Sequence, residues 1–277
     1  MSAAADNPVE LARRLETDGY VVIENALSAD ELSALNAAVD RYLDAYPEEW
    51  IQMNDYTIEI ENLLPRTDDF DGIVEDQQML DILRHVIGEN ITFEQFSFMI
   101  RNPAPEASAF RGWHRDLTRD YNRRKEIDAI SSIYYLTDVT ESDTCFTIIP
   151  ESHKRLIDLD PADVGPDEGV DIRGPAGTAL LFHVGCVHAG KVKANSRQRR
   201  TLHVYYSRSG VPRTAEWSDI PERLYTKVDP ALPETFYSKW NESEVFEGVG
   251  KIPEGLDRSV PTPELVKAAL IAGKQSA

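Results

Sequence analysis

After residue 90, the sequence becomes a succession of short apolar runs that are rich in aromatic and β-branched residues. Turns that contain Pro, Gly and Asp separate these runs, as is typical of neighbouring β-strands. Because helical patterns come first and many short strands follow, we predict a β-sandwich or barrel with helices packed on one face. The expected strands cover residues 91–100, 129–136, 145–150, 178–188 and 200–207.

Before residue 90, apolar residues recur at the spacing of amphipathic helices. Ser28 and Glu31 form a capping-box pattern, which predicts that a helix begins directly behind them. Gly88 is well placed to end another helix, since glycine readily adopts the left-handed conformation found there. The expected elements are helices over 8–18, from 28 onward and over 76–87, with a short strand over 20–24.

The chain has 277 residues, and all-β barrels and sandwiches of this length are often undivided, so we expect one domain over 1–277. The stretch 158–176 is acidic and contains Pro and Gly, which predicts a surface loop. The expected order is N-terminal helices at about 8–90, a β-core at about 91–208 and a C-terminal wrap or lid at about 209–277, with a short helix near 262–272.

The composition excludes several classes of protein. Because 48 acidic and 29 basic side chains give a net charge of −19, phosphate backbones and anionic membrane faces should repel the chain. No run approaches the ~18 apolar residues of a membrane span, and the first residues lack a signal-peptide stretch. Cys145 and Cys186 lie in apolar runs, which predicts buried thiols rather than a disulfide framework. We therefore expect a cytoplasmic protein that binds neither nucleic acid nor membranes.

The segment FRGWHRDLTRD contains His114, Arg115 and Asp116. Residues i and i+2 of a strand point to the same face, so the imidazole and the carboxylate converge while Arg115 turns away. Two histidines and one carboxylate on one face of an ion leave three positions open, which suits non-haem iron(II) oxygenases. Taken alone, the H-x-D pattern could also be a surface His–Asp pair.

A second segment, LFHVGCVHAGKVKANSRQRRTLHVYYSR, offers a third ligand in His188. Arg199 follows eleven residues later, a spacing that allows a strand, a turn and entry into a neighbouring antiparallel strand. A guanidinium there would suit the far carboxylate of 2-oxoglutarate, because it binds carboxylates bidentately. His183 is an alternative ligand if Gly185 creates a bulge in the expected strand, and Arg200 is the alternative to Arg199.

Several segments resemble, in their order along the chain, those of the phytanoyl-CoA dioxygenase family of iron(II)/2-oxoglutarate oxygenases. They are DGYVVIENALSADEL near the start, GWHRD, YLTDVTESDTCFTIIPESHK, and GTALLFHVGCVHAG followed by NS and RR. The resemblance covers about residues 15–210. Glu151 replaces the glycine of the family's PGSH pattern, and residues 142–145 replace its ENGG pattern, so the conformation of that loop is left open.

The resemblance implies a mainly β protein with flanking helices (α+β) and a double-stranded β-helix core of the jelly-roll or cupin type. It implies that Fe(2+) is held by His114, Asp116 and His188, that Arg199 binds the co-substrate 2-oxoglutarate, and that O2 is the second co-substrate. Because Asp116 is intact, the resemblance favours hydroxylation or a related oxidation, with release of succinate and CO2, over halogenation. The alternatives are a non-oxidative cupin-type metal enzyme and a small-molecule-binding protein with a structural metal.

Basic residues cluster around His114 and after His188, which in an acidic chain predicts a positive rim that favours an anionic small-molecule substrate. A solvated basic loop paired with Asp and Glu is the other explanation. Arg111 is a candidate to bind the C1 carboxylate of 2-oxoglutarate or the substrate. We expect a monomer or a homodimer. Candidate pocket walls, each of which could instead face the core or solvent, are Trp113, Tyr134, Tyr135, Phe146 and His203.

Overall fold

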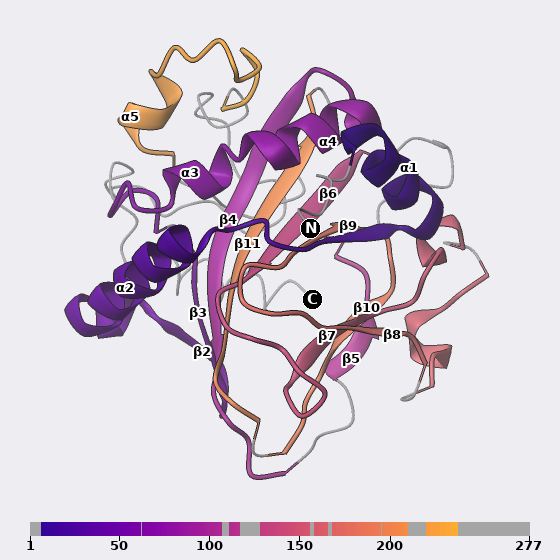
Figure 1. The fold of residues 1–277 in the computed structure, drawn as a ribbon. Helices are drawn as coiled ribbons and strands as arrows, with labels where there is room; N and C mark the ends of the chain where they lie inside the picture. The colour runs from indigo at the N-terminus through magenta and orange to yellow at the C-terminus, as the bar shows by residue number, and fades with distance from the viewer. Residues whose placement is uncertain are drawn as a thin grey trace, which may run out of the picture.

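The computed structural model describes residues 7–61, 63–106, 111–116, 128–155, 158–165, 168–194, 196–209 and 220–237. Two antiparallel β-sheets lie face to face, and helices cover the outer side of the larger sheet (Figure 1). This is the two-sheet arrangement of a jelly roll. The predicted mainly β fold with flanking helices is therefore confirmed.

Within the described residues, the larger sheet has seven strands and the smaller sheet has four. In sheet order the larger one contains β1 (Tyr20–Ile23), β9 (Ala179–His183), β6 (Ala129–Tyr135), β11 (Arg199–Arg208), β4 (Ile91–Arg101), β3 (Thr57–Glu61) and β2 (Ile51–Asn54). The smaller sheet contains β5 (Arg111–His114), β10 (His188–Lys191), β7 (Cys145–Ile148) and β8 (Val170–Ile172).

Three of the described helices begin at a side-chain cap, Asn7, Ser28 or Asp76, and the sequence predicts the cap at Ser28. Ser28 accepts a hydrogen bond from the Glu31 backbone, and the Glu31 carboxylate accepts one from the Ser28 backbone at 2.8 Å, which confirms the capping box. The described helices are α1 (Pro8–Asp18), α2 (Ala29–Ala45), α3 (Asp71–Val74), α4 (Gln77–Ile87) and α5 (Glu222–Tyr225), with 3₁₀ turns at Pro47–Glu49, Ser152–Lys154 and Pro161–Asp163.

The main hydrophobic core lies between the helices and the outer face of the larger sheet. Leu15 of α1, Val39 of α2 and Leu83 of α4 are fully buried in it. Phe96 and Phe98 of β4 belong to the same cluster. Burial of each such side chain stabilises the fold by roughly 1.5–3 kcal/mol. This packing fixes the larger sheet, whose other face carries the candidate site.

A second cluster lies between the two sheets. The rings of Phe146 in β7 and Phe182 in β9 are 5.0 Å apart and join the sheets. In β11, Thr201 lies opposite Tyr135, which belongs to this inner cluster, whereas Val204 belongs to the outer core. Because side chains alternate along a strand, the polar face of β11 points between the sheets rather than to solvent.

The sequence interpretation of 178–188 as one strand is wrong, because the chain turns in the middle of it. β9 ends at His183 in the larger sheet, and β10 begins at His188 in the smaller one. The turn is closed by hydrogen bonds from Cys186 N to the His183 carbonyl and from Gly185 N to Nδ1 of His183, both 2.8 Å. The chain therefore crosses from one sheet to the other just before the third predicted ligand.

Other differences from the sequence interpretation lie at the edges of the sheets. The predicted surface loop 158–176 contains the edge strand β8, and β2 and β3 extend the larger sheet without having been predicted. The helix expected near 262–272 lies outside the described residues. The division into helices, core and lid stays a prediction, as does the single domain.

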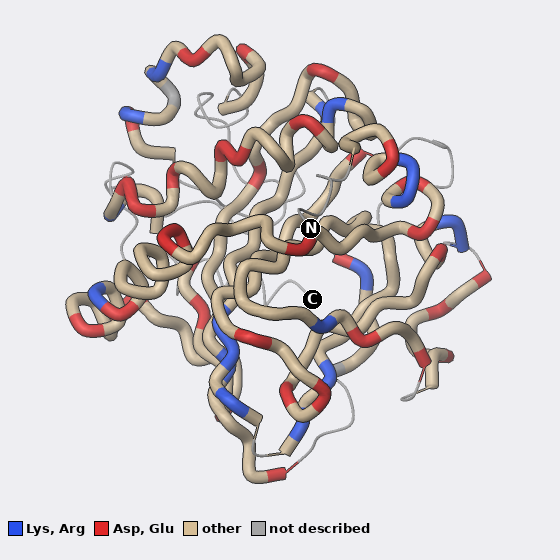
Figure 2. The backbone as a smooth tube through the Cα atoms, viewed as in Figure 1, with Lys and Arg blue, Asp and Glu red and all other residues tan. Residues whose placement is uncertain are grey.

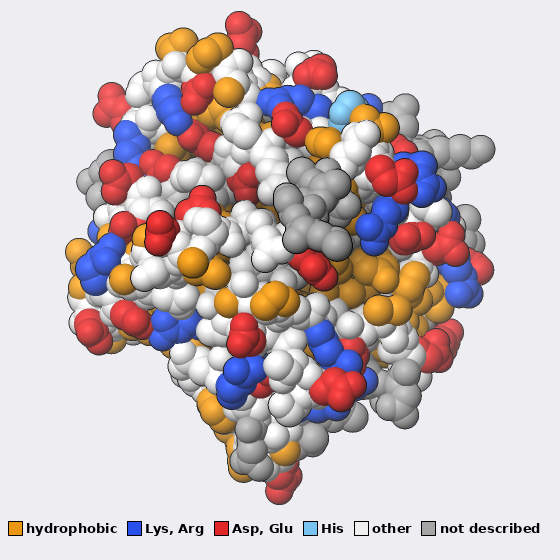
Figure 3. Space-filling view, viewed as in Figure 1, with side chains coloured by type: hydrophobic (Ala, Val, Ile, Leu, Met, Phe, Trp, Pro, Cys, Tyr) orange, Lys and Arg blue, Asp and Glu red, His pale blue; other side chains and the backbone are white. Residues whose placement is uncertain are grey.

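The surface carries mixed charge. Figure 2 shows acidic segments mainly on the helices and loops, with several basic segments near the lower ends of β4 and β11. The face in Figure 3 has acidic and basic side chains interspersed with small hydrophobic areas. None of the helices in the described ranges is long and apolar enough to cross a bilayer.

Candidate active site

His114, Asp116 and His188 come together where β5 pairs with β10. His188 lies directly opposite His114 in this antiparallel pair, and the two ring centroids are 4.3 Å apart. Oδ1 of Asp116 is 3.2 Å from Nε2 of His188 and 3.6 Å from Nε2 of His114. Among the residues that the structure describes, this is the one cluster of at least three His, Cys, Asp or Glu donors arranged to hold a metal ion.

A hydrogen bond between Nδ1 and a backbone carbonyl fixes the orientation of each imidazole. Nδ1 of His114 lies 3.1 Å from the Gly112 carbonyl, and Nδ1 of His188 lies 3.0 Å from the Cys186 carbonyl. A carbonyl can only accept, so Nδ1 carries the proton in each ring. Each Nε2 therefore keeps its lone pair and is directed to the Asp116 carboxylate, as metal-binding histidines require.

Asp116 lies two residues beyond the end of its strand, which stops at His114. The expected placement of Asp116 on the strand itself is therefore wrong, although the two side chains converge as predicted. A hydrogen bond from Asp116 N to the Val184 carbonyl, 3.1 Å long, fixes the backbone. The Tyr205 hydroxyl donates to Oδ2 at 3.1 Å, which leaves Oδ1 to the two histidines.

The three side chains form one electrostatic unit. Burial alone would raise the pKa of Asp116, but His188 and His114 outweigh it and hold that pKa well below its ordinary value. When no ion lies between them, the protonated His114 ring donates from Nε2 to Asp116, and this hydrogen bond raises the pKa of His114. Asp116 is thus a carboxylate at neutral pH and can act as an anionic metal ligand.

Arg115, between the two predicted ligands, ties the site to its surroundings. Its Nη1 donates to the carbonyls of Ser152 and Gly185, and its Nη2 donates to those of Arg155 and Leu159. Gly185 belongs to the turn that leads into His188, so one guanidinium connects both ligand-bearing segments. The sequence reasoning correctly turned Arg115 away from the metal but did not find this role.

The donor set fits an octahedral divalent metal such as iron(II). Ligand atoms on neighbouring corners of an octahedron with bonds of about 2.1 Å lie about 3.0 Å apart. The separations of 3.2 and 3.6 Å around Oδ1 of Asp116 are close to that value. Two imidazoles and one carboxylate would occupy one face of the ion and leave three positions for other ligands.

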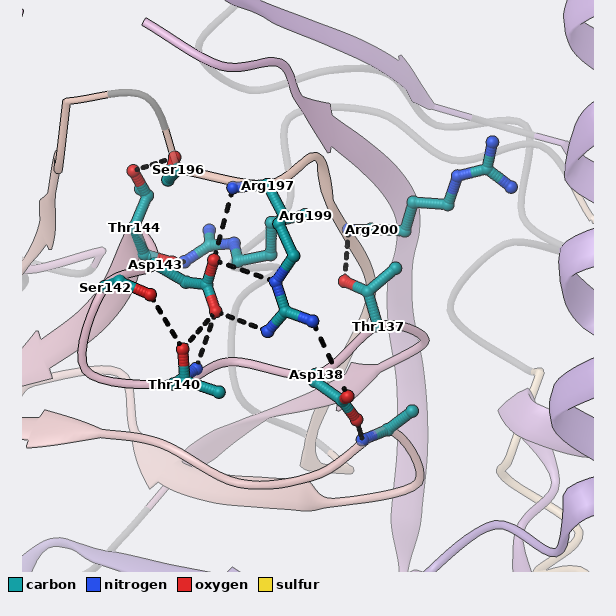
Figure 4. A network of polar contacts seen from close by, with 11 residues as sticks. Thr137, Asp138, Thr140, Ser142, Asp143, Thr144, Ser196, Arg197, Arg199 and Arg200 are labelled. Carbon is teal, nitrogen blue, oxygen red and sulfur yellow. Dashed lines mark hydrogen bonds and ion pairs between the residues drawn. The ribbon is translucent and has the colours of Figure 1, made fainter.

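Arg199 starts β11 and is 6% exposed, on the inner face of the larger sheet. Its Nη1 donates to the Thr144 carbonyl at 3.4 Å, while Nε has no hydrogen-bond partner within the described residues. Burial acts to lower the pKa of this arginine. Arg200 points to the opposite side, where it donates to Asp40 at 2.7 Å, as Figure 4 illustrates for the two side chains. The structure thus favours Arg199 over Arg200 as the arginine that faces the site.

The loop before β7 is closed by an ion pair between the buried Asp143 carboxylate and the exposed Arg197 guanidinium (Figure 4). The carboxylate of Asp143 accepts from Nη2 of Arg197 at 2.7 Å and from the backbone and hydroxyl of Thr140 at 2.8 and 2.7 Å. The Thr144 hydroxyl pairs with that of Ser196 at 3.2 Å. These contacts present the Thr144 carbonyl to Arg199, so the unusual residues at 142–145 form an ordered support.

Not all of the predicted pocket walls face the site. Phe146 stacks on His188 with 5.0 Å between centroids, and His203 shares the inner face with Tyr135. Tyr134 belongs to the outer core and donates to Asp76 at 2.9 Å. Trp113 donates through Nε1 to the Gly165 carbonyl at 3.1 Å. Phe146, Tyr135 and His203 are therefore the ones placed between the sheets.

His183 lies apart from the cluster, in the other sheet. It stacks on His153 at 5.1 Å, and burial lowers its pKa to about 3. His153 contacts the Glu16 carbonyl at 3.1 Å. The turn at 184–187 thus separates His183 from His188, and the structure does not join the alternative ligand to the other two.

The predicted basic rim is largely neutralised where it is described. Lys191 contacts Asp171 at 3.2 Å, and Arg197 and Arg200 pair with acidic residues as given above. The side chain of Arg111 lies outside the described part of the chain, although its backbone begins β5 opposite Gly190. Residues 117–127, which carry the remaining basic residues near His114, also lie outside it.

A jelly-roll core with two histidines and one carboxylate placed to hold a metal ion is the arrangement of the non-haem iron(II) oxygenases. The chain belongs to the phytanoyl-CoA dioxygenase (PhyH) family, whose model matches residues 15–201. It is accordingly an iron(II)- and 2-oxoglutarate-dependent dioxygenase, as the motifs in the sequence predict.

Relatives and solved structures agree with this assignment. The chain is 25% identical over 227 residues to a probable alpha-ketoglutarate-dependent hypophosphite dioxygenase of Stutzerimonas stutzeri, covering 72% of this chain and 78% of the relative. It is 24% identical over 236 residues to the ectoine dioxygenase of Stutzerimonas stutzeri (strain A1501), covering 72% and 76%. The fold matches the non-heme alpha ketoglutarate dependent epimerase SnoN from nogalamycin biosynthesis, with a TM-score of 0.63, 19% identity, and coverage of 83% of this chain and 97% of that one.

The Asp143–Arg197 pair gives a prediction for stability. The hydrogen bonds from Arg197 hold the pKa of Asp143 well below its ordinary value of about 3.9. A lowered folded-state pKa stabilises the protein above about pH 4, and this contribution is lost as the pH falls further. Asp143→Asn should therefore lower the free energy of unfolding by about 1 kcal/mol at pH 7, because solvent screens the exposed Arg197 guanidinium. The difference from the wild type should shrink between about pH 4 and pH 2.5.

Urea unfolding across this pH range measures the effect. Asp158→Asn is the matched control, because Asp158 pairs with Arg155 on the surface and its side chain is 65% exposed. It should change stability little at any pH. A difference for Asp143→Asn that stays constant down to pH 2.5 would contradict the prediction.

Proposed function

We propose that His114, Asp116 and His188 hold the iron, that Arg199 binds the far carboxylate of 2-oxoglutarate, and that the enzyme hydroxylates a small anionic molecule. The observation that carries this proposal is the convergence of two free Nε2 atoms on Oδ1 of Asp116. The buried Arg199, with Nε unpaired within the described residues, supports it from the same inner space.

The side chains around the site position and protect the reactants. Bound iron(II) supplies the activation of O2, with 2-oxoglutarate consumed to succinate and CO2. Tyr205 orients the Asp116 carboxylate, and the Phe146 and Phe182 rings exclude water beside His188. Arg199 fixes the far end of the co-substrate, so that its 2-oxo end is directed to the three side chains. We assign Arg111 to the C1 carboxylate of 2-oxoglutarate or to the substrate.

The substrate class follows from charge and from one relative. Arg199 is assigned to 2-oxoglutarate, so the charge that bears on the substrate is that of the basic residues near His114 in the sequence, such as Arg119 and Arg123, which favour an anionic ligand. The relative named for hypophosphite is named for a small anion, which agrees with this class. A hydroxylated product distinguishes the proposal from a cupin-type enzyme that does not consume 2-oxoglutarate.

Removal of one ligand tests the proposed function. Protein mixed with iron(II) and 2-oxoglutarate without oxygen should develop a visible charge-transfer band, and admission of oxygen should release succinate. His188→Ala should lose both signals down to the level of iron-free protein, because two ligands hold the ion too weakly. His85→Ala, an exposed histidine on α4, is the matched control and should keep both. Wild-type protein with neither band nor succinate would overturn the proposed function.

Removal of the hydrogen bond from Tyr205 to Asp116 tests whether a residue outside the three ligands supports metal binding. Tyr205→Phe removes that bond and should weaken iron(II) affinity by roughly 10- to 100-fold, as loss of such supporting contacts does elsewhere. Competition with a chromophoric chelator under anaerobic conditions measures the affinity. Tyr206→Phe is the matched control, because its hydroxyl bonds the Val74 carbonyl on the outer face at 3.0 Å. Equal metal affinity in the two variants would show that Tyr205 does not support a ligand.

A further inference from the structure

We propose that Arg101 is a second arginine for 2-oxoglutarate, and that Arg101 and Arg199 hold its far carboxylate together in a recess beside Gly190. The inference rests on the proposed function, since it adds to the role given there to Arg199. Neither the sequence motifs nor the relatives point to Arg101, which ends β4 just before Asn102 and Pro103.

The sheet places the two arginines side by side. Arg101 of β4 and Arg199 of β11 are directly paired residues of neighbouring antiparallel strands. Side chains of such a pair point to the same face, with Cα atoms roughly 4.5–5.5 Å apart. That face is the inner one, because the next inward residue of β11, Thr201, lies opposite Tyr135 of the inner cluster. Each arginine is only 6% exposed.

Gly190 shows where the Arg101 head lies. A Cβ atom added to Gly190 would be 2.6 Å from Nη1 of Arg101. The guanidinium therefore extends from the larger sheet across the interior to β10 in the smaller sheet. A side chain at position 190 would displace the guanidinium from this position, whereas the glycine leaves room for it.

This position is at the right distance from the proposed iron ligands. Gly190 follows His188 by two residues in β10, and two residues of a strand span about 6.7 Å. Gly190 lies opposite Phe146 of β7, and Arg199 donates to Thr144, just before the same strand. Both guanidinium groups therefore contact the smaller sheet near the residues that follow His188 in β10. A five-carbon dicarboxylate chelated beside His188 would extend its far carboxylate in that direction.

His203 lies between the two arginines and the metal cluster, and the charges of both arginines affect its pKa. Burial and then Arg199 lower the pKa of His203 to about 3, and Arg101 acts in the same direction. His203 is therefore neutral, and its Nε2 shares a hydrogen bond with the Thr201 hydroxyl at 2.9 Å. With His203 uncharged, the two arginines are the positive groups identified on this inner face, and they suit an anion.

Two guanidinium groups would select for the second carboxylate of the ligand. Each can donate two parallel hydrogen bonds to a carboxylate, and such charge-assisted bonds are the stronger kind. A 2-oxo acid that ends in a methyl group would leave both arginines without this partner. The wild type should therefore discriminate strongly between 2-oxoglutarate and 2-oxopentanoate, which differ at that end.

Calorimetric titration of the Mn(II)-loaded protein with each 2-oxo acid tests the inference without turnover. Arg101→Met should weaken 2-oxoglutarate binding by roughly 10- to 100-fold, the range for lost hydrogen bonds to charged groups. The same change should leave 2-oxopentanoate binding within about threefold of wild type, because that ligand has no second carboxylate for Arg101 to bind. Arg200→Met, the neighbouring arginine on the outer face, is the matched control and should alter neither affinity.

A second variant, Gly190→Ala, tests the inference independently in case Arg101→Met does not fold. Gly190→Ala keeps both arginines but displaces the Arg101 head, so it should weaken 2-oxoglutarate binding while Mn(II) affinity stays unchanged. Unchanged 2-oxoglutarate binding in folded Arg101→Met or in Gly190→Ala would overturn the inference, and a loss confined to the primary substrate would assign Arg101 there instead. If the wild type itself does not bind 2-oxoglutarate, the proposed function fails, which is a distinguishable result.

Discussion

The register between β5 and β10 is the constraint on which the site depends. It places His188 opposite His114, and a slip by one residue would turn one of the imidazoles to the other face. Arg115 then holds the segment after β5 against the turn before β10, through carbonyls of Ser152 and Gly185. Asp116 reaches the two histidines because its own backbone is bound to Val184 in that turn. One strand pairing and one half-buried guanidinium thus bring two distant sequence motifs together in a single cluster.

Local patterns predicted the parts of this structure that depend on neighbouring residues. The capping box at Ser28, the helix that ends at Gly88 and the alternation along β11 all follow from spacings of a few residues. Spacing also brought His114 and Asp116 together, although the strand ends before Asp116. His188 followed from the order of the family motifs, and the structure places it where that order implies.

Features that depend on contacts between distant segments could not be predicted. The run 178–188 is mainly apolar, so its periodicity does not reveal that the chain changes sheets at Gly185. The strands β2, β3 and β8 are short and contain polar or charged residues, which hides them among loop sequences. Arg101 lies 98 positions before Arg199, and nothing in its local sequence distinguishes it from a surface arginine. The nearest signal was Gly190, a glycine inside a strand, which often marks the close approach of another group.

The distribution of charge connects the acidic surface to the site. Lys191 is paired with Asp171 and Arg200 with Asp40, so these two charges contribute little to the field around the site. Arg199 faces inward, and its charge is screened less because little water reaches it. An anion that approaches this molecule therefore meets a repulsive exterior and an attractive interior. Such a contrast favours small anions that can enter the space between the sheets over large polyanions, which the net charge of −19 repels as a whole.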